Sequence, residues 1–330
     1  MNEKIWLNNV RSLACIMVLI VHVTAIYKYS YGAIDTVYWY FAVILDSASR
    51  MCVPLFFMIS GYLFLQGKNV KIKNLIKIFS ALTFYSLLSV IYWSLFHGRD
   101  FLSGLSQIYT KPALYHLWFM FYIFSFYILF MFMSARNVEP KKGICVIASV
   151  FIILNFNLNE LFQFFGINYR NNFVITSYHL QLLFYCFAGV FIGNIKENQR
   201  FFKTAITLCT LSIMIIFALT IDKSIESNKL NPLFQGYTSI PVFISSTTMF
   251  YILKCYGERP IFGRLTKTIS SYSLAIYGVH AIYLEIIRTK KIFLFDNPVL
   301  NLLSTILIVF SLSYLTAYLI RFFDKNGYVS

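Results

Sequence analysis

Residues 8–23 read NNVRSLACIMVLIVHV, an apolar run with one arginine near its start and one histidine near its end. The apolar segment extends over residues 10–29, and about 20 mostly apolar residues suffice to cross a lipid bilayer as a helix. Lys4 precedes the run, as in a secretory signal. However, Arg11 and His22 interrupt it and no small-residue cleavage site follows. Segment 10–29 is therefore predicted to be a retained first transmembrane helix.

Apolar runs of this kind continue along the whole chain. Of the 330 residues, 58% are hydrophobic and only 12% are charged, whereas a soluble domain carries about 25% charged residues. The sequence predicts an all-α polytopic integral membrane protein with one domain over residues 1–330. About ten transmembrane helices are expected, at residues 10–29, 38–65, 75–97, 114–134, 143–160, 178–195, 202–221, 238–256, 268–288 and 298–321.

The basic residues follow the pattern in which cytoplasmic loops are positive. With ten spans and the N-terminus inside, the inner segments hold about twice as many Lys and Arg residues as the outer ones. This bias favours an N-in, C-in topology, in which Lys28 counts as an outer residue and Arg50 lies within the membrane. The net charge of +15 is then explained by loops that face anionic membrane lipid. No separate basic domain indicates a nucleic-acid partner.

Arg11 and His22 share one face of the predicted first helix. Eleven residues at about 100° each make three turns plus about 20°, with a rise of about 16 Å. Arg11 would thus lie at the cytoplasmic mouth and His22 somewhat past the bilayer centre. A snorkelling arginine and a hydrogen-bonded core histidine would explain either residue alone. The aligned pair favours a functional site, because ionisable groups inside membranes usually mark a pathway or a reaction site.

The second predicted helix is interrupted. Asp46 and Arg50 stand four residues apart, and Pro54 follows. The segment is expected to be kinked, or to be an outer piece followed by the true span. Mutual neutralisation of Asp46 and Arg50 and a role for Arg50 in substrate binding have about equal weight. Ser60 and Gly61 permit close approach of another helix.

Two later segments carry further polar candidates within apolar sequence. His116 and Trp118 open the fourth predicted helix, and Tyr277 and His280 stand three residues apart in the ninth. Trp118 could also be an interfacial belt residue. A histidine at mid-span beside a tyrosine is a second strong intramembrane candidate.

The inner loop after the second predicted helix is rich in lysine, and two explanations fit it. Positive-inside topology alone accounts for the cluster, and anchoring the phosphates of a cytosolic donor is the functional alternative. No metal site is predicted, because the histidines lack clustered carboxylates or cysteines and none of the six cysteines forms a C-x-x-C pair. The lysines of this inner loop are Lys68, Lys71, Lys73 and Lys77.

In four separated motifs the chain resembles the acyltransferase-3 family, integral-membrane enzymes of bacteria that O-acetylate surface glycans. The match runs from the first predicted helix to the C-terminal Arg321-x-x-Asp324-x-Asn326. The segment Ser47-Ala48-Ser49-Arg50 and the length are most similar to the branch that O-acetylates enterobacterial common antigen. The motifs are Arg11-x10-His22, VPLFFMISGYL at 53–63, HLWF at 116–119 and SLAIYGVH at 273–280.

Two positions and one loop depart from the family pattern. Asn8 stands where the family often has aspartate, and Ser12 stands where it usually has glycine. The inner loop that is often rich in arginine carries lysine here, and lysine lacks the bidentate fork of a guanidinium.

The resemblance implies an enzyme of the cell inner membrane, an O-acetyltransferase that takes acetyl-CoA from the cytosol as donor. The acceptor would be a hydroxyl of a surface polysaccharide or of its lipid-linked precursor. Arg11, Lys73 and Lys77 would hold the donor, and His22 would act either as general base or as an acetyl-histidine relay. Arg11 and His280 complete the expected catalytic set. The residues expected to bind substrate or stabilise the oxyanion are Arg50, His116, Trp118 and Tyr277.

A transporter or flippase for a glycan or lipid intermediate is the competing function. Such a protein would also need intramembrane histidine and arginine, although the sequence shows no inverted repeat. A structural membrane scaffold is a third class, and it would not need Arg11 and His22 on one face.

Overall fold

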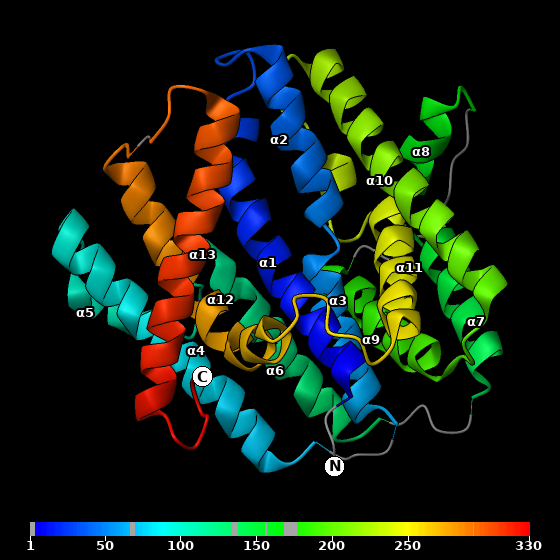
Figure 1. Ribbon diagram of the computed structural model, residues 1–330, viewed down its shortest axis with the longest axis horizontal. Coiled ribbons are helices and arrows are strands. Elements are labelled where there is room, and N and C mark those ends of the chain that lie inside the picture. Colours follow the sequence, from blue (N-terminus) through cyan, green and yellow to red (C-terminus); the bar gives the residue numbers. More distant parts are fainter. Residues whose placement is uncertain (1–3, 67–69, 134–137, 156, 168–176, 293) are drawn as a thin grey trace. The chain divides into compact units, whose positions relative to one another are not determined.

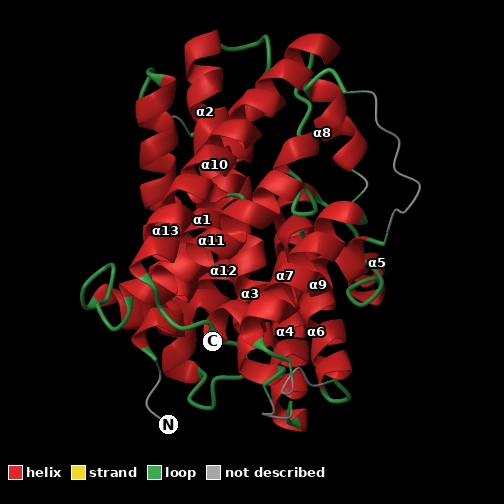
Figure 2. Cartoon of the chain, turned by 90° about the vertical axis from the view of Figure 1, so that its right-hand side faces the viewer, coloured by secondary structure: helices red, strands yellow, loops and turns green. Residues whose placement is uncertain are grey.

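The computed structural model describes residues 4–66, 70–133, 138–155, 157–167, 177–292 and 294–330, and these residues form helices and loops without a strand (Figures 1 and 2). The predicted all-α class is therefore confirmed. The helices are α1 (Ile5–Lys28), α2 (Thr36–Ser49), α3 (Cys52–Phe64), α4 (Ile72–His97), α5 (Phe101–Ser106), η1 (Tyr115–Leu117), α6 (Trp118–Phe130), α7 (Pro140–Ile153), α8 (Leu158–Phe164), α9 (Tyr178–Asn194), α10 (Gln199–Ser227), η2 (Leu233–Gln235), α11 (Ile240–Tyr256), α12 (Leu265–Thr289) and α13 (Pro298–Phe323).

Five helices in the described ranges are long and apolar enough to cross a membrane. A sixth span is obtained if α7 and α8, which are bent by 73°, count as one broken helix. Each of the ten predicted segments overlaps one of the helices or a helix pair. The number that cross the bilayer and the N-in, C-in orientation stay predictions. The five helices that are long and apolar enough to span a membrane are α1, the pair α2 and α3 counted as one, α4, α10 and α13.

The predicted interruption of the second segment is confirmed, and its position is residues 50–51. α2 ends at Ser49 and α3 begins at Cys52. Pro54 lies in the first turn of α3, where a backbone N–H has no partner within the helix, so proline is tolerated there. The break therefore precedes the proline, and both helices contribute to the single apolar stretch Thr36–Phe64.

The chain divides into two compact units, each made of two stretches of sequence. The first unit comprises Met1–Lys68 and Ser134–Lys267, and the second comprises Asn69–Met133 and Thr268–Ser330. In the first unit α1 packs against α2, α3 and α11, and α9 packs against α3, α7 and α11. The assignment of residues 1–330 to one domain stays a prediction.

Glycines bring the backbones of α3 and α9 into direct contact in the first unit. A Cβ added to Gly61 would lie 1.9 Å from the carbonyl oxygen of Cys186. A Cβ added to Gly189 would lie 2.1 Å from the carbonyl oxygen of Met58. Neither position has room for a side chain, which is how small residues let membrane helices approach closely. The close approach predicted at Ser60-Gly61 is confirmed.

Gly61→Ala is expected to destabilise the protein by about 2 kcal/mol or more, since overpacking a close contact costs about 1–3 kcal/mol and this contact is with backbone. Thermal unfolding of the purified protein in detergent measures the change. Gly236→Ala is the matched control, because its added Cβ would come no closer than 3.2 Å to another atom. Equal unfolding temperatures for the two variants would contradict this account of the helix contact.

In the second unit α4 packs against α5, α6 and η1. Gly278 of α12 also lies against α4, because an added Cβ would be 2.3 Å from the ring of Tyr85. The segment after α13 folds back and is held by Asp324, which accepts hydrogen bonds from the backbone N–H groups of Tyr328 (3.0 Å) and Val329 (2.7 Å). Burial acts to raise the pKa of Asp324, but these donors outweigh it and hold the pKa below its usual value.

Candidate functional site

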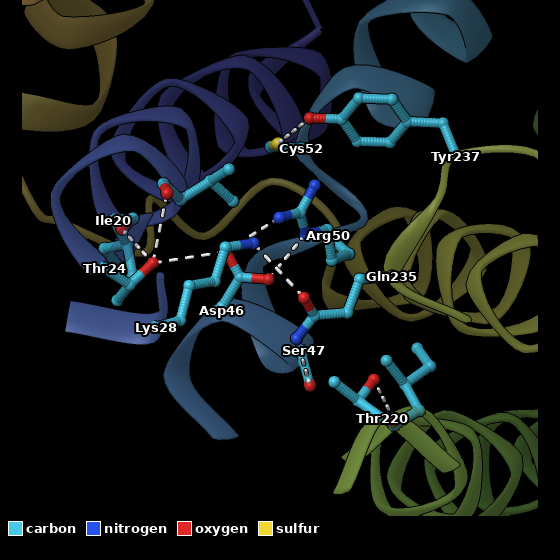
Figure 3. Close-up of polar contacts among 12 residues, drawn as sticks. Ile20, Thr24, Lys28, Asp46, Ser47, Arg50, Cys52, Thr220, Gln235 and Tyr237 are labelled. Atoms are coloured by element: carbon cyan, nitrogen blue, oxygen red, sulfur yellow. Dashed lines mark hydrogen bonds and ion pairs between the residues drawn. The ribbon is translucent and has the colours of Figure 1, made fainter. Parts of the chain in front are cut away.

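A cluster of buried charges lies where α1 and α2 pack together in the first unit (Figure 3). Asp46 accepts two hydrogen bonds from Arg50, at 2.6 Å from Nε and 2.9 Å from the second guanidinium nitrogen. Lys28 Nζ lies 3.0 Å from the same carboxylate. Asp46 is completely buried and Lys28 is 2% exposed. The cluster is therefore a three-residue ionic network in the interior of the unit.

Regular helical spacing places these side chains. Thr24 and Lys28 lie one turn apart on α1, and Asp46 and Arg50 lie one turn apart at the end of α2. Thr24 donates its hydroxyl to Asp46 at 3.2 Å. Gln235 of η2 completes the network, because its side-chain oxygen accepts from Lys28 at 3.2 Å. Residues of α1 and α2 thus surround the carboxylate, and η2 joins the network through Lys28.

The cluster carries one more positive than negative charge. Arg50 and Lys28 are cations, and Asp46 is the single anion among the residues that Figure 3 labels. The Asp46–Arg50 neutralisation considered from sequence does form, but Lys28 adds a second cation. An unbalanced buried positive charge is costly, and an electron-rich group beside it would lower that cost.

Arg50 is the member of the cluster that reaches the surface. Its side chain is 14% exposed, whereas that of Asp46 is inaccessible. Its guanidinium carbon lies 5.8 Å from the centre of the Tyr237 ring, and the Tyr237 hydroxyl is 3.8 Å from Cys52 Sγ. Asp46 therefore holds the guanidinium in one orientation from its buried side.

Arg11 and His22 lie on a different face of α1 from this cluster. Both are half-buried. His22 precedes Thr24 by two residues, or about 200° around the helix. On α1 His22 therefore points about 160° away from Thr24 and about 120° away from Lys28, on the same side as Arg11.

Three predicted site residues do come together in the second unit. His116 of η1 lies with its ring centre 5.2 Å from that of Tyr277 and 5.0 Å from that of His280, both of α12. The hydroxyl of Tyr277 donates to the backbone oxygen of His116. His116 and His280 are buried. Trp118 follows directly in α6 and packs edge-on against Tyr122 at 5.3 Å.

Backbone carbonyls orient both histidine rings of this group. His116 Nε2 lies 3.3 Å from the carbonyl oxygen of Gly278, and His280 Nδ1 lies 2.6 Å from that of Tyr277. A nitrogen beside a carbonyl oxygen must carry the proton. The other nitrogen of each neutral ring, Nδ1 of His116 and Nε2 of His280, therefore carries a lone pair. Such nitrogens can accept a hydrogen bond or a proton from a hydroxyl.

Lys73 and Lys77 lie in one basic pocket of about 320 Å³ in the second unit. Its other wall comes from Arg321 at the end of α13 and from the segment that Asp324 holds. Lys77 Nζ donates to the backbone oxygen of Ser330 at 3.1 Å. Four cations and flexible hydrogen-bond donors suit a ligand with several phosphates. The lining is Lys71, Lys73, Asn74, Lys77, Arg321, Asn326, Gly327 and Tyr328, while Lys68 lies outside the described residues.

The side chains that sequence reasoning missed are the other members of this cluster and the tyrosine beside Arg50. Lys28, which the predicted topology counts among the outer residues, is buried at the end of α1 and bound to Asp46. Gln235 and Tyr237 come from more than 180 residues farther along the chain. The four-residue spacing of Thr24 and Lys28 was the one local signal. No group of three metal-binding side chains occurs in the described part of the chain.

Comparison with known proteins supplies independent information. The family model described as an acyltransferase domain, Acyl_transf_3, matches residues 4–321. This range includes every site residue described above except the last residues of the basic pocket. No curated protein and no solved structure matches the chain.

Proposed function

The chain belongs to the acyltransferase-3 family, and from that premise we propose that it transfers an acetyl group from acetyl-CoA to a hydroxyl of a surface polysaccharide or its lipid-linked precursor. The family match and the apolar helices support a membrane acyltransferase. We place the enzyme in the inner membrane, with the donor entering from the cytosol. Enterobacterial common antigen is the polymer that the 47–50 segment favours.

The observation that carries the choice of donor is the basic pocket. Coenzyme A carries a diphosphate and a further phosphate on its ribose, and the pocket gathers Lys71, Lys73, Lys77 and Arg321. Lysine ammonium groups bind phosphate as point charges, and the arginine adds a planar fork. Arg11 is the second expected donor contact, at the cytoplasmic end of α1.

The proposed reaction is one acyl transfer with His22 as general base. His22 takes the proton of the acceptor hydroxyl while the oxygen attacks the thioester carbonyl. The carbon–sulfur bond then breaks, and the proton passes from His22 to the thiolate of coenzyme A. Hydrogen bonds aimed at the developing oxyanion lower the barrier, and we assign this role to Arg50, which belongs to the same unit as His22. Tyr277 and His280 of the second unit are the groups we assign to the acceptor. His116 and Trp118 line the acceptor side.

Release of free coenzyme A by the purified protein in nanodiscs tests the proposal. Acetyl-CoA is supplied with membranes from a strain that lacks the gene, and free thiol is followed over time. We expect thiol release together with acetyl appearing in the glycan fraction. Glycan or lipid movement across liposomes without any thiol release would instead support the transporter.

Lys73→Gln is expected to raise the KM for acetyl-CoA about tenfold or more, because one charged hydrogen bond contributes about 1.5–3 kcal/mol. Lys73 is exposed and lines the basic pocket. Lys325→Gln removes the same charge from an exposed residue nearby that does not line it. Initial rates over a range of acetyl-CoA concentrations measure the effect. An equal KM for the two variants would remove the donor phosphates from this pocket.

A further inference from the structure

A second pocket of about 480 Å³ lies at the other end of α4 from the basic pocket. Lys77 and Trp93 are sixteen residues apart on α4, or about 24 Å at 1.5 Å per residue. All residues that line this second pocket belong to the second unit. Its aromatic, charged and larger polar lining residues are Trp93, Arg99, Asp100, Ser103, Gln107 and Lys111. We call this cavity the α4–α5 pocket.

The walls of the α4–α5 pocket are fixed by local structure. Gly98 ends α4 in the left-handed conformation, with φ of 63°, a geometry that glycine adopts without cost. Asp100 caps α5 by accepting the N–H of Ser103 at 2.6 Å. Gly104 then lets α5 pack on α4, because an added Cβ would lie 2.8 Å from Val90. The cavity is therefore built by the fold and is not a gap between loose side chains.

The polar groups around the pocket include both donors and acceptors. The guanidinium carbon of Arg99 lies 3.8 Å from the centre of the Trp93 ring, a cation–π stack. The indole nitrogen of Trp93 is buried and has no hydrogen-bond partner in the described part of the chain. Arg99 itself is exposed and lies over the tryptophan ring. A buried donor without a partner calls for an explanation, and a ligand with acceptor oxygens provides one.

The chemistry of the lining selects the class of ligand. The volume lies in the range of about 300–1,000 Å³ that small-molecule sites occupy, which is too large for a simple anion. Charged and amide side chains on both sides exclude a lipid tail, whose burial against them would be costly. An aromatic ring flanked by hydrogen-bonding groups fits a sugar, which has both apolar C–H faces and hydroxyls. Arg99 and Lys111 against Asp100 leave one excess positive charge, which favours an anionic ligand.

The surroundings of the pocket indicate that it lies at a membrane surface. Leu95, Phe96 and Leu102 are apolar and strongly exposed beside it. Apolar residues beside charged ones are typical of segments that lie in the lipid interface. A saccharide bound there would be close to the membrane, as in a lipid-linked glycan.

We propose that the α4–α5 pocket binds the acceptor as an anionic saccharide, with a sugar ring at Trp93 and its carboxylate or phosphate at Arg99 and Lys111. That the bound saccharide is the acetyl acceptor rests on the proposed function. Binding of the saccharide itself needs neither the donor nor turnover. Donor phosphates and acceptor sugar then lie at opposite ends of one helix. Trp93, Arg99 and Lys111 are specificity residues on this account.

Ligand-detected NMR on the full-length protein in nanodiscs of phosphatidylcholine tests the proposal without acetyl-CoA. The probes are cellobiouronic acid, which carries a carboxylate, maltose 1-phosphate, which carries a phosphate, and neutral cellobiose. We expect at least one anionic probe to bind more tightly than cellobiose. The anionic probe with the lower Kd shows whether the pocket recognises a carboxylate or a phosphate.

Variants of the exposed cations complete the test. Arg99→Gln is expected to weaken the favoured probe about tenfold, the loss for one charged hydrogen bond, and Lys111→Gln to weaken it in the same direction. Lys290→Gln removes an equal charge from an exposed residue outside the pocket and is expected to leave the Kd unchanged. Equal binding of all three probes, or equal Kd for Arg99→Gln and Lys290→Gln, overturns the assignment. Absence of acetyl transfer with intact probe binding would overturn only the proposed function.

Discussion

Replacing His22 by alanine is expected to lower acetyl transfer by about 10²–10⁴-fold, because a positioned general base contributes a factor of that size. His22 is a half-buried histidine within the apolar helix α1, on the same face as Arg11. Insertion into the membrane and the unfolding temperature are checked first, and initial rates are then measured at saturating acetyl-CoA.

The exposed His179 in the first turn of α9 supplies the control. His179→Ala is expected to transfer acetyl at the wild-type rate. A His22→Ala protein that is inserted, folded and as active as His179→Ala would remove His22 from the mechanism. Intact-mass analysis with acetyl-CoA but no acceptor separates the two routes, since only the acetyl-histidine relay predicts an acetylated wild-type enzyme.

Asp46→Ala is expected to destabilise the protein by about 3–5 kcal/mol, the cost of leaving a buried charge without its partner. Both Lys28 and Arg50 would lose their counter-ion, and Lys28 is only 2% exposed. Thermal unfolding in detergent measures the loss. The control is Glu226→Gln, which breaks an ion pair with Lys223 whose carboxylate side chain is 66% exposed. Such a surface pair contributes at most about 1 kcal/mol.

Because the cluster holds two cations and one anion, removing one cation is expected to cost less stability than removing the carboxylate. Lys28→Met leaves Asp46 and Arg50 as a neutral pair with two hydrogen bonds, so it leaves no buried charge without a partner, which is the costly outcome. We therefore expect Lys28→Met to be much less destabilising than Asp46→Ala. Equal losses would show that Lys28 is as necessary to the cluster as its carboxylate.

The helical architecture could be predicted from the sequence because each apolar run is a local signal. The break at residues 50–51 and the close approach at Gly61 were also local, since a charged i,i+4 pair and a small residue mark them in one segment. The count of spanning helices could not be settled the same way. α9 and α11 have 17 residues each, which is near the lower limit for crossing a bilayer of about 17–25 residues.

The contacts of the site were less accessible to sequence reasoning because they join distant segments. The grouping of His116 with Tyr277 and His280 crosses about half the chain, and the three were found separately as polar residues in apolar surroundings. Lys28 counts among the outer basic residues in the predicted topology, because a lysine at the end of an apolar run is typical of a residue that flanks a span. Only the fold shows that Asp46 lies beside it.

Mass spectrometry of the surface glycans tests the central claim most directly. Glycans are compared between a strain that lacks the gene, the same strain carrying the wild-type gene, and the same strain carrying His22→Ala. The account predicts that one polymer loses an acetyl mass increment in the deletion strain, that the wild-type gene restores it and that His22→Ala does not. Glycans of identical mass in the deletion and the complemented strain would contradict acetyl transfer to a surface polysaccharide.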